Sequence, residues 1–136
     1  MDKFAKCPCD SKMLYHKCCK QYHDGALPDK AEALMRSRYC AYALGLIDYV
    51  MDTTHPEHPQ FDTDRVRWKA DLQAFAKHTR FDRLKVLDCK DGEKIATVKF
   101  TAFLRQGDND ASFTEDSTFE KIDGKWLYKS GEVQQA

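Results

Sequence analysis

The sequence predicts an α+β fold in which two helices precede a four-stranded antiparallel sheet. Apolar residues recur at helical spacing between Met35 and Tyr49, and later in the chain the period changes to the alternation typical of strands. A third observation sets the beginning of the chain apart, because four of the six cysteines fall within residues 6–20. We therefore predict a small cysteine module at residues 1–27 and an α+β domain at residues 28–136.

Composition limits the function classes. A chain of 136 residues with a hydrophobic share of 42% can form one packed core. Basic and acidic residues number 22 each, so there is no strong nucleic-acid signal and no net attraction to an anionic membrane. The N-terminus lacks an apolar leader, and no apolar run is long enough to span a bilayer. We therefore expect a cytoplasmic location, where clustered cysteines indicate metal binding rather than disulfides.

Residues 29–53 are predicted to form one long helix. Asp29 can cap its N-terminus, and Glu32 three positions later can complete a capping box. The helix should end before Pro56, because a proline disfavours helical geometry in the residue that precedes it.

A proline-stiffened loop is expected at residues 55–62, followed by a second helix at about 64–77. The side chains expected to face inward from that helix are Val66, Leu72 and Phe75. The two cysteines outside the N-terminal module, Cys40 and Cys89, are expected to pack as small apolar core residues.

Two Asp-Gly pairs, at residues 91–92 and 123–124, are strong signals for hairpins with two-residue loops. A looser turn at residues 106–112 lies between them, so the strands should form a meander.

The second of these loops fixes a register for the last hairpin. It places Phe119 opposite Tyr128 and Lys121 opposite Trp126. Alternation along both strands then puts one set of side chains on a single aromatic face, which should be the buried one. The members of this face are Phe113, Glu115, Ser117, Phe119, Trp126, Tyr128 and Ser130.

The spacing of the N-terminal cysteines predicts a metal site. Four thiols this close would repel one another as thiolates and oxidise readily unless an ion held them. Structural zinc prefers four such ligands in a tetrahedron, although thiolates also bind iron. Adjacent ligands are less usual than a two-residue gap, so His16 or His23 could replace one thiol. We predict one Zn²⁺ ion held by Cys7, Cys9, Cys18 and Cys19.

The segment CPCDSKMLYHKCC resembles the SEC-C motif, a zinc module with the pattern C-x-C-x8-C-[CH] that is found in the secretion ATPase SecA. The segments AEALMRSRYCAY, TTHPE, FTEDSTFEK and GKWLYKSGEV are similar to the YchJ-like family of uncharacterised bacterial proteins. This resemblance covers nearly the whole chain. It implies a SEC-C module joined to a cystatin-like, nuclear transport factor 2-like domain, with a long helix packed on a curved meander. Asp10 and Lys12 replace the family's usual loop glycines, so we expect the loop path to differ somewhat.

Glu115 and Ser117 lie among aromatic residues on the predicted inward face. They should either bond a buried group such as Arg36, Arg38 or His55, where an arginine would form a structural ion pair, or line a cavity. The resemblance implies a cavity, because domains of this fold often hold a small molecule in a cone between helix and sheet. Glu115 or His55 could act there as a general acid or base. The predicted pocket residues are Tyr39, Tyr42, Trp68, Ser117 and Trp126.

Two functions from different classes follow. The first is an adaptor that docks on a protein or ribonucleoprotein partner through the lysine-rich cysteine module, by analogy with SecA. The second is a small-molecule-binding protein or enzyme that uses the cone. The sequence contains no nucleophile motif, phosphate-binding glycine loop or paired-carboxylate signature, so we favour the adaptor. An open sheet face that carries aromatic residues would also allow a homodimer.

Overall fold

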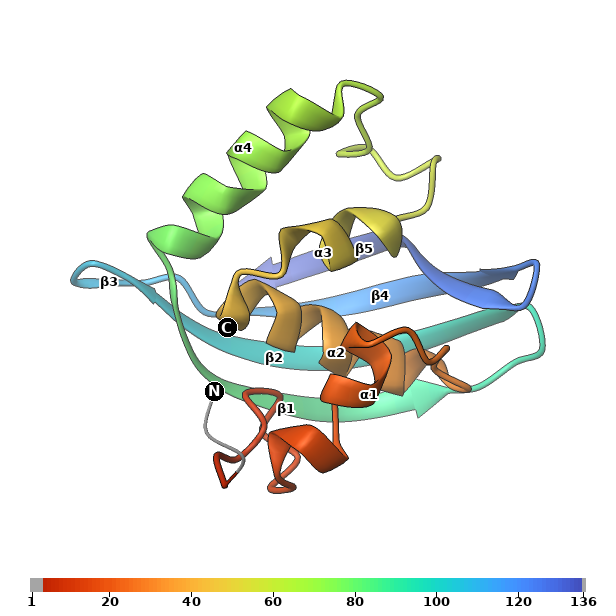
Figure 1. Ribbon diagram of the computed structural model, residues 1–136, viewed down its shortest axis with the longest axis horizontal. Coiled ribbons are helices and arrows are strands. Elements are labelled where there is room, and N and C mark those ends of the chain that lie inside the picture. Colours follow the sequence, from red (N-terminus) through yellow and green to blue (C-terminus); the bar gives the residue numbers. More distant parts are fainter. Residues whose placement is uncertain (1–3, 136) are drawn as a thin grey trace.

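The computed structural model describes residues 4–135 and confirms the α+β fold. Its strands are β1 (Arg80–Lys90), β2 (Ile95–Gln106), β3 (Asn109–Asp110), β4 (Phe113–Ile122) and β5 (Lys125–Gln135). They form one sheet in the order β1-β2-β4-β5, with the short β3 paired to β2 (Figure 1). Each neighbouring pair is antiparallel, so the predicted meander of four long strands is present.

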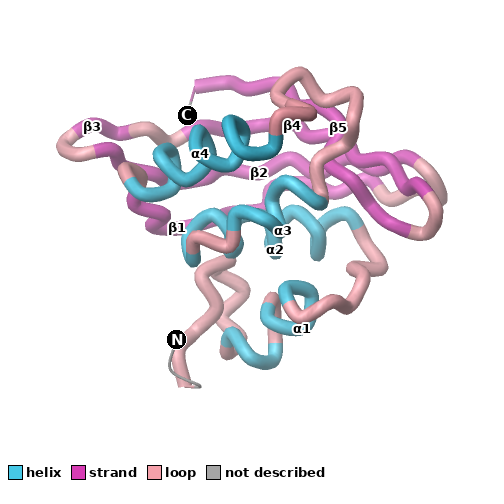
Figure 2. Tube along the Cα trace, turned by 45° about the horizontal axis from the view of Figure 1, so that its top comes forward, coloured by secondary structure: helices cyan, strands magenta, loops and turns pink. Residues whose placement is uncertain are grey.

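The helices lie in the first part of the chain. They are η1 (Tyr15–Lys17), α1 (Lys20–His23), α2 (Ala31–Leu44), α3 (Ile47–Asp52) and α4 (Arg65–Lys77). In Figures 1 and 2, α2 runs across the sheet, α1 lies on one side of α2 and α4 on the other. Within residues 4–135, every helix is too short or too polar to cross a membrane.

The long helix predicted at residues 29–53 is wrong, because Gly45 divides it into α2 and α3. Gly45 has a left-handed φ of 76° and donates its N–H to the carbonyl of Tyr42 at 3.2 Å. Glycine takes this conformation without the steric cost that a Cβ would bring, and it is the usual residue just past a helix end. The break redirects the chain, so that α3 packs against α4.

The predicted capping box at the start of α2 is also wrong. The N-cap residue is Lys30, which is extended and makes no side-chain bond to the helix. The carbonyl of Asp29 instead accepts the indole N–H of Trp126 at 2.9 Å, across 97 positions of sequence. This bond fixes the beginning of α2 to the last strand.

The second predicted helix is confirmed as α4, but its buried face differs. Asp64 caps it by accepting the backbone N–H of Arg67 at 3.1 Å. Val66 was expected to face inward and is 83% exposed, whereas Trp68 is buried. Phe75 lies at the surface, where its ring edge contacts Tyr42. The inward face consists of Trp68, Leu72 and Ala76, so the prediction was correct only for Leu72.

The last hairpin confirms the predicted two-residue loop, since Asp123 and Gly124 both have positive φ. The predicted pairs of Phe119 with Tyr128 and of Lys121 with Trp126 are present. The first hairpin differs, because four residues, 91–94, separate β1 from β2.

A β-bulge at Lys129 changes the faces in the rest of β5. Thr118 pairs with Ser130, so one extra residue stands between this pair and the next. Ser130 is therefore exposed, and its predicted place on the inward face is wrong. Gly131 takes that place opposite Ser117.

Two apolar clusters stabilise the fold. The larger lies between α2 and the sheet and includes Leu34, Met35, Cys40, Val98, Phe119 and Trp126. Three cysteines of the N-terminal module, Cys7, Cys9 and Cys19, belong to the same cluster. The smaller cluster joins α3 to α4 through Ile47, Met51 and Trp68.

Candidate metal centre

Two short turns position the four thiols. Cys7 and Cys9 lie in a loop that is closed by the N–H of Cys7 donating to the carbonyl of Met13 at 2.8 Å. Asp10 and Lys12 in this loop have φ of 64° and 72°, so both keep the left-handed geometry that glycines would supply. The expected difference in loop path from the glycine-containing relatives stays a prediction. On the other side, Cys18 follows η1 and Cys19 precedes α1.

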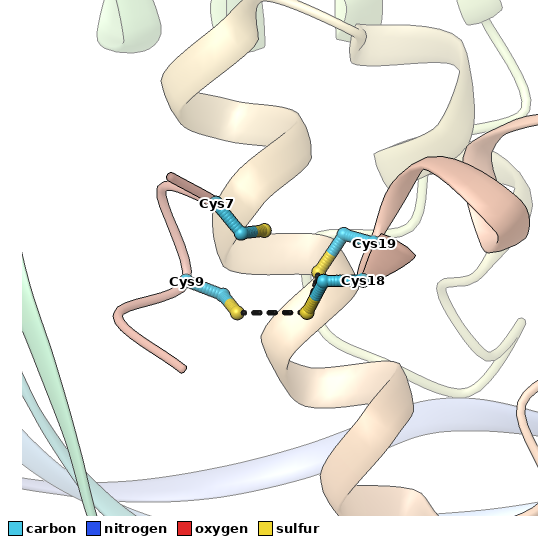
Figure 3. Close-up of side chains that lie close together, drawn as sticks. All are labelled: Cys7, Cys9, Cys18 and Cys19. Carbon is cyan, nitrogen blue, oxygen red and sulfur yellow. Dashed lines mark hydrogen bonds between the residues drawn. The ribbon is translucent and has the colours of Figure 1, made fainter. Parts of the chain in front are cut away.

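The four sulfur atoms converge on one point. All four Sγ atoms lie within 4.8 Å of one another, and Cys7, Cys9 and Cys19 are buried. Sγ of Cys18 is 3.6 Å from Sγ of Cys9 and 4.0 Å from Sγ of Cys19 (Figure 3). Zn–S bonds of 2.3 Å in a tetrahedron place sulfur atoms about 3.8 Å apart. The residues thus fit a tetrahedral metal ion.

The proximity of the thiols perturbs their acidity. The pKa of Cys7 is lowered, because the thiols of Cys19, Cys40 and Cys9 can stabilise its thiolate by hydrogen bonding. The pKa of Cys19 is raised, chiefly by hydrogen bonds with Cys40 and Cys7. For Cys9, the hydrogen bond to Cys19 lowers the pKa, but the bond to Cys7 and burial raise it to about 11 overall. Four thiolates can coexist here only if a cation balances their charge.

A fifth sulfur lies beside the cluster and was missed by sequence reasoning. Cys40, on α2, is fully buried, and its Sγ is 3.8 Å from Sγ of Cys7. The expectation that Cys40 packs in the core is confirmed, but its contact with a candidate ligand was not foreseen. Helical periodicity places Cys40 in the core, and nothing in its local sequence indicates a neighbour 33 positions away.

Polar groups hold the loop that carries Cys7 and Cys9 on the α+β domain. Arg36 donates from Nη1 to the carbonyl of Cys9 at 2.9 Å and from Nε to Glu32 at 3.0 Å. The hydroxyl of Ser11 lies 3.2 Å from Sγ of Cys18. Cys89, from β1, donates to Glu32 at 3.3 Å. The thiol cluster is therefore fixed to both α2 and the sheet.

The two histidines proposed as alternative ligands are absent from the cluster. Nδ1 of His23 is 2.8 Å from the hydroxyl of Tyr15, and its Nε2 is 2.9 Å from the carbonyl of Ser37. Both ring nitrogens are therefore engaged. His16 is exposed and does not join the four sulfur atoms that come together.

The candidate acid-base residues are satisfied by protein groups. Glu115 is buried and accepts from the hydroxyls of Ser117 and Tyr128, the second at 2.8 Å. It does not form the ion pair considered for Arg36 or Arg38. Nδ1 of His55 accepts the N–H of Glu57 at 2.9 Å, so Nε2 carries the proton and donates to Glu120 at 2.6 Å. No ring nitrogen of His55 is left to face a substrate, and general acid-base catalysis by either residue stays a prediction.

The predicted pocket residues are not all brought together. Tyr42 and Trp68 line a cavity of about 10 Å³, room for about one water molecule. Tyr39 donates its hydroxyl to the carbonyl of Arg83 at 2.9 Å, whereas Ser117 and Trp126 make the bonds already described. The cavity lies between α2, α3, α4, the loop before α4 and β5. It is lined by Arg38, Tyr42, Val50, Thr54, His58, Gln60, Trp68, Leu72 and Tyr128.

Comparison with known proteins extends over both the cysteine module and the sheet. Residues 30–131 match the family model described as YchJ, middle NTF2-like domain. A UPF0225 protein of Actinobacillus succinogenes is 40% identical over 134 residues, which cover 96% of this chain and 83% of that protein. A SEC-C motif containing protein from Rhodopseudomonas palustris, known from its solution structure, is 34% identical with a TM-score of 0.78, covering 90% of this chain and 93% of that one. The crystal structure of a SEC-C motif containing protein from Psychrobacter arcticus gives a TM-score of 0.79 at 27% identity, with coverage of 98% and 85%.

Proposed function

The chain belongs to the YchJ-like family, and from that premise we propose that it binds one zinc ion in a structural site and docks on a protein partner through the module around that site. The observation that carries the proposal is the approach of four thiols to within 4.8 Å of one another. The ligands are Cys7, Cys9, Cys18 and Cys19.

The donor set supports zinc in a structural role. Four soft thiolates complete the tetrahedron, so no coordination position is left for a substrate or water. Three of the four thiols are buried, and the fourth is half-buried beside Ser11. The ion would fix the loop of Cys7 and Cys9 to the turn of Cys18 and Cys19, two segments with little regular structure of their own.

The surface of the module supports docking on an acidic protein. Phe4 and Met13 are 70% and 51% exposed, and Lys6 and Lys17 are exposed. Among the described residues of the module, the carboxylates of Asp10 and Asp24 are already paired, with Lys12 and Lys20 respectively. Lys3, part of the same lysine group, lies outside the described residues. Apolar side chains next to unbalanced lysines suit a partner with an acidic, partly apolar surface.

Native mass spectrometry tests the metal. We expect the reduced protein to carry the mass of one metal ion, lost on denaturation, and elemental analysis to identify it as zinc. A protein with six freely reacting thiols and no bound metal would contradict the proposal. Iron in place of zinc would contradict only the identity of the ion.

Partner capture tests the docking surface while leaving the metal in place. The double variant Lys6→Glu, Lys17→Glu should retain the metal and lose partners that the unchanged protein retains from a lysate, because acidic surfaces would repel it. Lys85→Glu, an exposed change on β1, is the matched control. Equal capture by all three proteins would contradict docking through the module, and loss of binding after ribonuclease treatment would instead indicate a ribonucleoprotein.

A further inference from the structure

Arg38 on α2 is a buried cation without a carboxylate partner. Its side chain is 8% exposed, and none of the ion pairs among residues 4–135 includes it. Nη1 donates to the carbonyl of Val50 at 2.9 Å and to the hydroxyls of Thr53 and Thr54 at 2.7 and 3.1 Å. Burial lowers the pKa of the guanidinium, which shows that its surroundings disfavour the charge. Nε and Nη2 donate to no acceptor in the described part of the chain.

Two other residues that line the cavity carry hydrogen-bond donors without a partner in the described part of the chain. The hydroxyl of Tyr42 and the indole N–H of Trp68 make no hydrogen bond with any residue in the described range, and both residues line the cavity with Arg38. None of the fully enclosed side-chain N or O atoms in this range lacks a partner, so these two donor atoms are at least partly accessible. Tyr42 also borders a second hollow beside Gly45. Nδ1 of His58 accepts the N–H of Gln60 at 3.0 Å, which leaves its proton on Nε2.

The lining is rich in donors and poor in negative charge. No aspartate or glutamate is among the lining residues. Burial and the charge of Arg38 lower the pKa of His58, so this ring is a neutral donor there. A cavity with one buried positive charge and several unpaired N–H and O–H groups is complementary to an anion.

We propose that this cavity binds the carboxylate group of a small organic acid, held by the Nε–Nη2 edge of Arg38 and by the hydroxyl of Tyr42. Two parallel N–H groups of a guanidinium match the two oxygens of a carboxylate. One negative charge balances one guanidinium, whereas a phosphate dianion would leave excess charge in a buried site. The closed cavity admits about one water molecule, less than the three heavy atoms of a carboxylate, so the head group enters only when α4 moves outward. The rest of the acid then extends toward His58 and the exposed Gln60.

The competing explanation is that Arg38 only stabilises the fold and binds no ligand. Its guanidinium carbon lies 4.8 Å from the ring centroid of Tyr128, whose hydroxyl donates to Glu115. The negative charge of Glu115 also raises the pKa of Arg38 and so opposes the effect of burial. The contact with Tyr128 occupies the face of the guanidinium and leaves the Nε–Nη2 edge without an acceptor. A purely structural role of Arg38 therefore does not account for the unpaired donors.

The test uses nuclear magnetic resonance of the ¹⁵N-labelled, metal-loaded full chain. The chain has two tryptophans, and Trp126 serves as an internal control because its indole N–H is already bonded to Asp29. Sodium acetate is titrated against sodium chloride at equal ionic strength. We expect saturable shifts of the Trp68 indole N–H and the Arg38 Nε–H with acetate, and no comparable shift of the Trp126 indole.

Arg38→Lys would also remove the structural contacts of the guanidinium and could destabilise the fold. More conservative variants are therefore used. Tyr42→Phe removes one donor and keeps the ring, and it should weaken acetate binding about tenfold. Tyr22→Phe, on α1 and outside the cavity, should leave binding unchanged.

Three outcomes would overturn the proposal. If acetate changes the chemical shifts no more than chloride does, the cavity holds only water and the role of Arg38 is structural. A response to inorganic phosphate alone would refute the carboxylate assignment. Unchanged affinity in Tyr42→Phe would place the anion elsewhere.

Discussion

Two buried clusters lie on opposite sides of the same turn of α2, and we propose ions of opposite charge for them. Cys40 contacts the thiol cluster, the proposed cation site, and Arg38 lines the cavity, the proposed anion site. Residues two positions apart on a helix point about 200° apart, which separates the two clusters. The thiol ligands are close in sequence, whereas the cavity is assembled from four distant segments. Local spacing therefore reveals the first cluster, and only the fold reveals the second.

The largest expected effect tests whether the thiol cluster is part of the main core. The double variant Cys9→Ser, Cys18→Ser should lose the metal and destabilise the whole protein by at least about 3 kcal/mol, because its neighbours Cys7 and Cys19 pack among core residues. The melting temperature should fall by about 10 °C, measured by calorimetry. Cys89→Ser is the matched control, because Cys89 is outside the four-thiol cluster and a serine can still donate to Glu32. An unchanged melting temperature would show that the module folds and unfolds by itself.

A smaller effect tests the packing around Glu115, whose hydrogen-bond partner Tyr128 lines the cavity. Gly131 has no space for a side chain, since a Cβ there would lie 2.5 Å from Glu115 and 2.7 Å from the hydroxyl of Tyr128. Gly131→Ala should therefore destabilise the protein by about 2 kcal/mol, measured by urea unfolding. Ser130→Ala, at the exposed neighbour, should change stability by less than about 0.5 kcal/mol. Equal effects of the two substitutions would contradict the close packing around Glu115.

The contact between Cys40 and the thiol cluster should tune metal affinity. Sγ of Cys7 lies 3.8 Å from Sγ of Cys40. As a metal-bound thiolate, Cys7 could only accept a hydrogen bond, so Cys40 would be the donor in the metal-loaded protein. Cys40→Ala should lower the metal affinity about tenfold in competition with a chelator, at unchanged stoichiometry. Cys40→Ser keeps a donor and should recover most of the loss. If serine and alanine lower the affinity equally, Cys40 acts through packing alone.

The smallest effect concerns the loop that forms part of the cavity. The pKa of Glu120 is lowered, first by its hydrogen bond with His55 and then by Lys129. A lowered carboxyl pKa contributes stability above the unfolded-state value, and this contribution is lost as pH falls through the folded-state value. The stability of Glu120→Gln should therefore fall below that of the unchanged protein at neutral pH and converge with it in acid. Parallel unfolding curves across the acidic range would contradict this role.

Much of the sheet could be predicted from sequence, because its signals are local. The Asp-Gly pair at 123–124 sets both a loop and a register, and the pairing of Phe119 with Tyr128 follows from it. The bulge at Lys129 was missed, since an extra residue leaves the alternation pattern intact on each side. The break at Gly45 was missed because apolar residues continue at helical spacing on both sides of it.

The two candidate sites also differ in how far sequence could predict them. The convergence of Cys7, Cys9, Cys18 and Cys19 could be predicted because the four residues lie close in sequence. Tyr42 and Trp68 were named as pocket residues, and the structure places both at the cavity. The unpaired edge of Arg38 had no sequence signal, because it depends on where Glu115 finds its own partners. Hydrogen-bond satisfaction is a property of the folded chain and not of residue type.

The separate cluster of Ile47, Met51 and Trp68 has a consequence for motion. It attaches α4 to α3 without including α4 in the core between α2 and the sheet. Elements with few buried contacts open locally at lower free energy than the remainder of a protein. Amide hydrogens of α4 should therefore exchange with solvent faster than those of α2 while the sheet stays closed. Each such opening would carry Trp68 away from Arg38 and admit a solute to a cavity that otherwise holds about one water molecule.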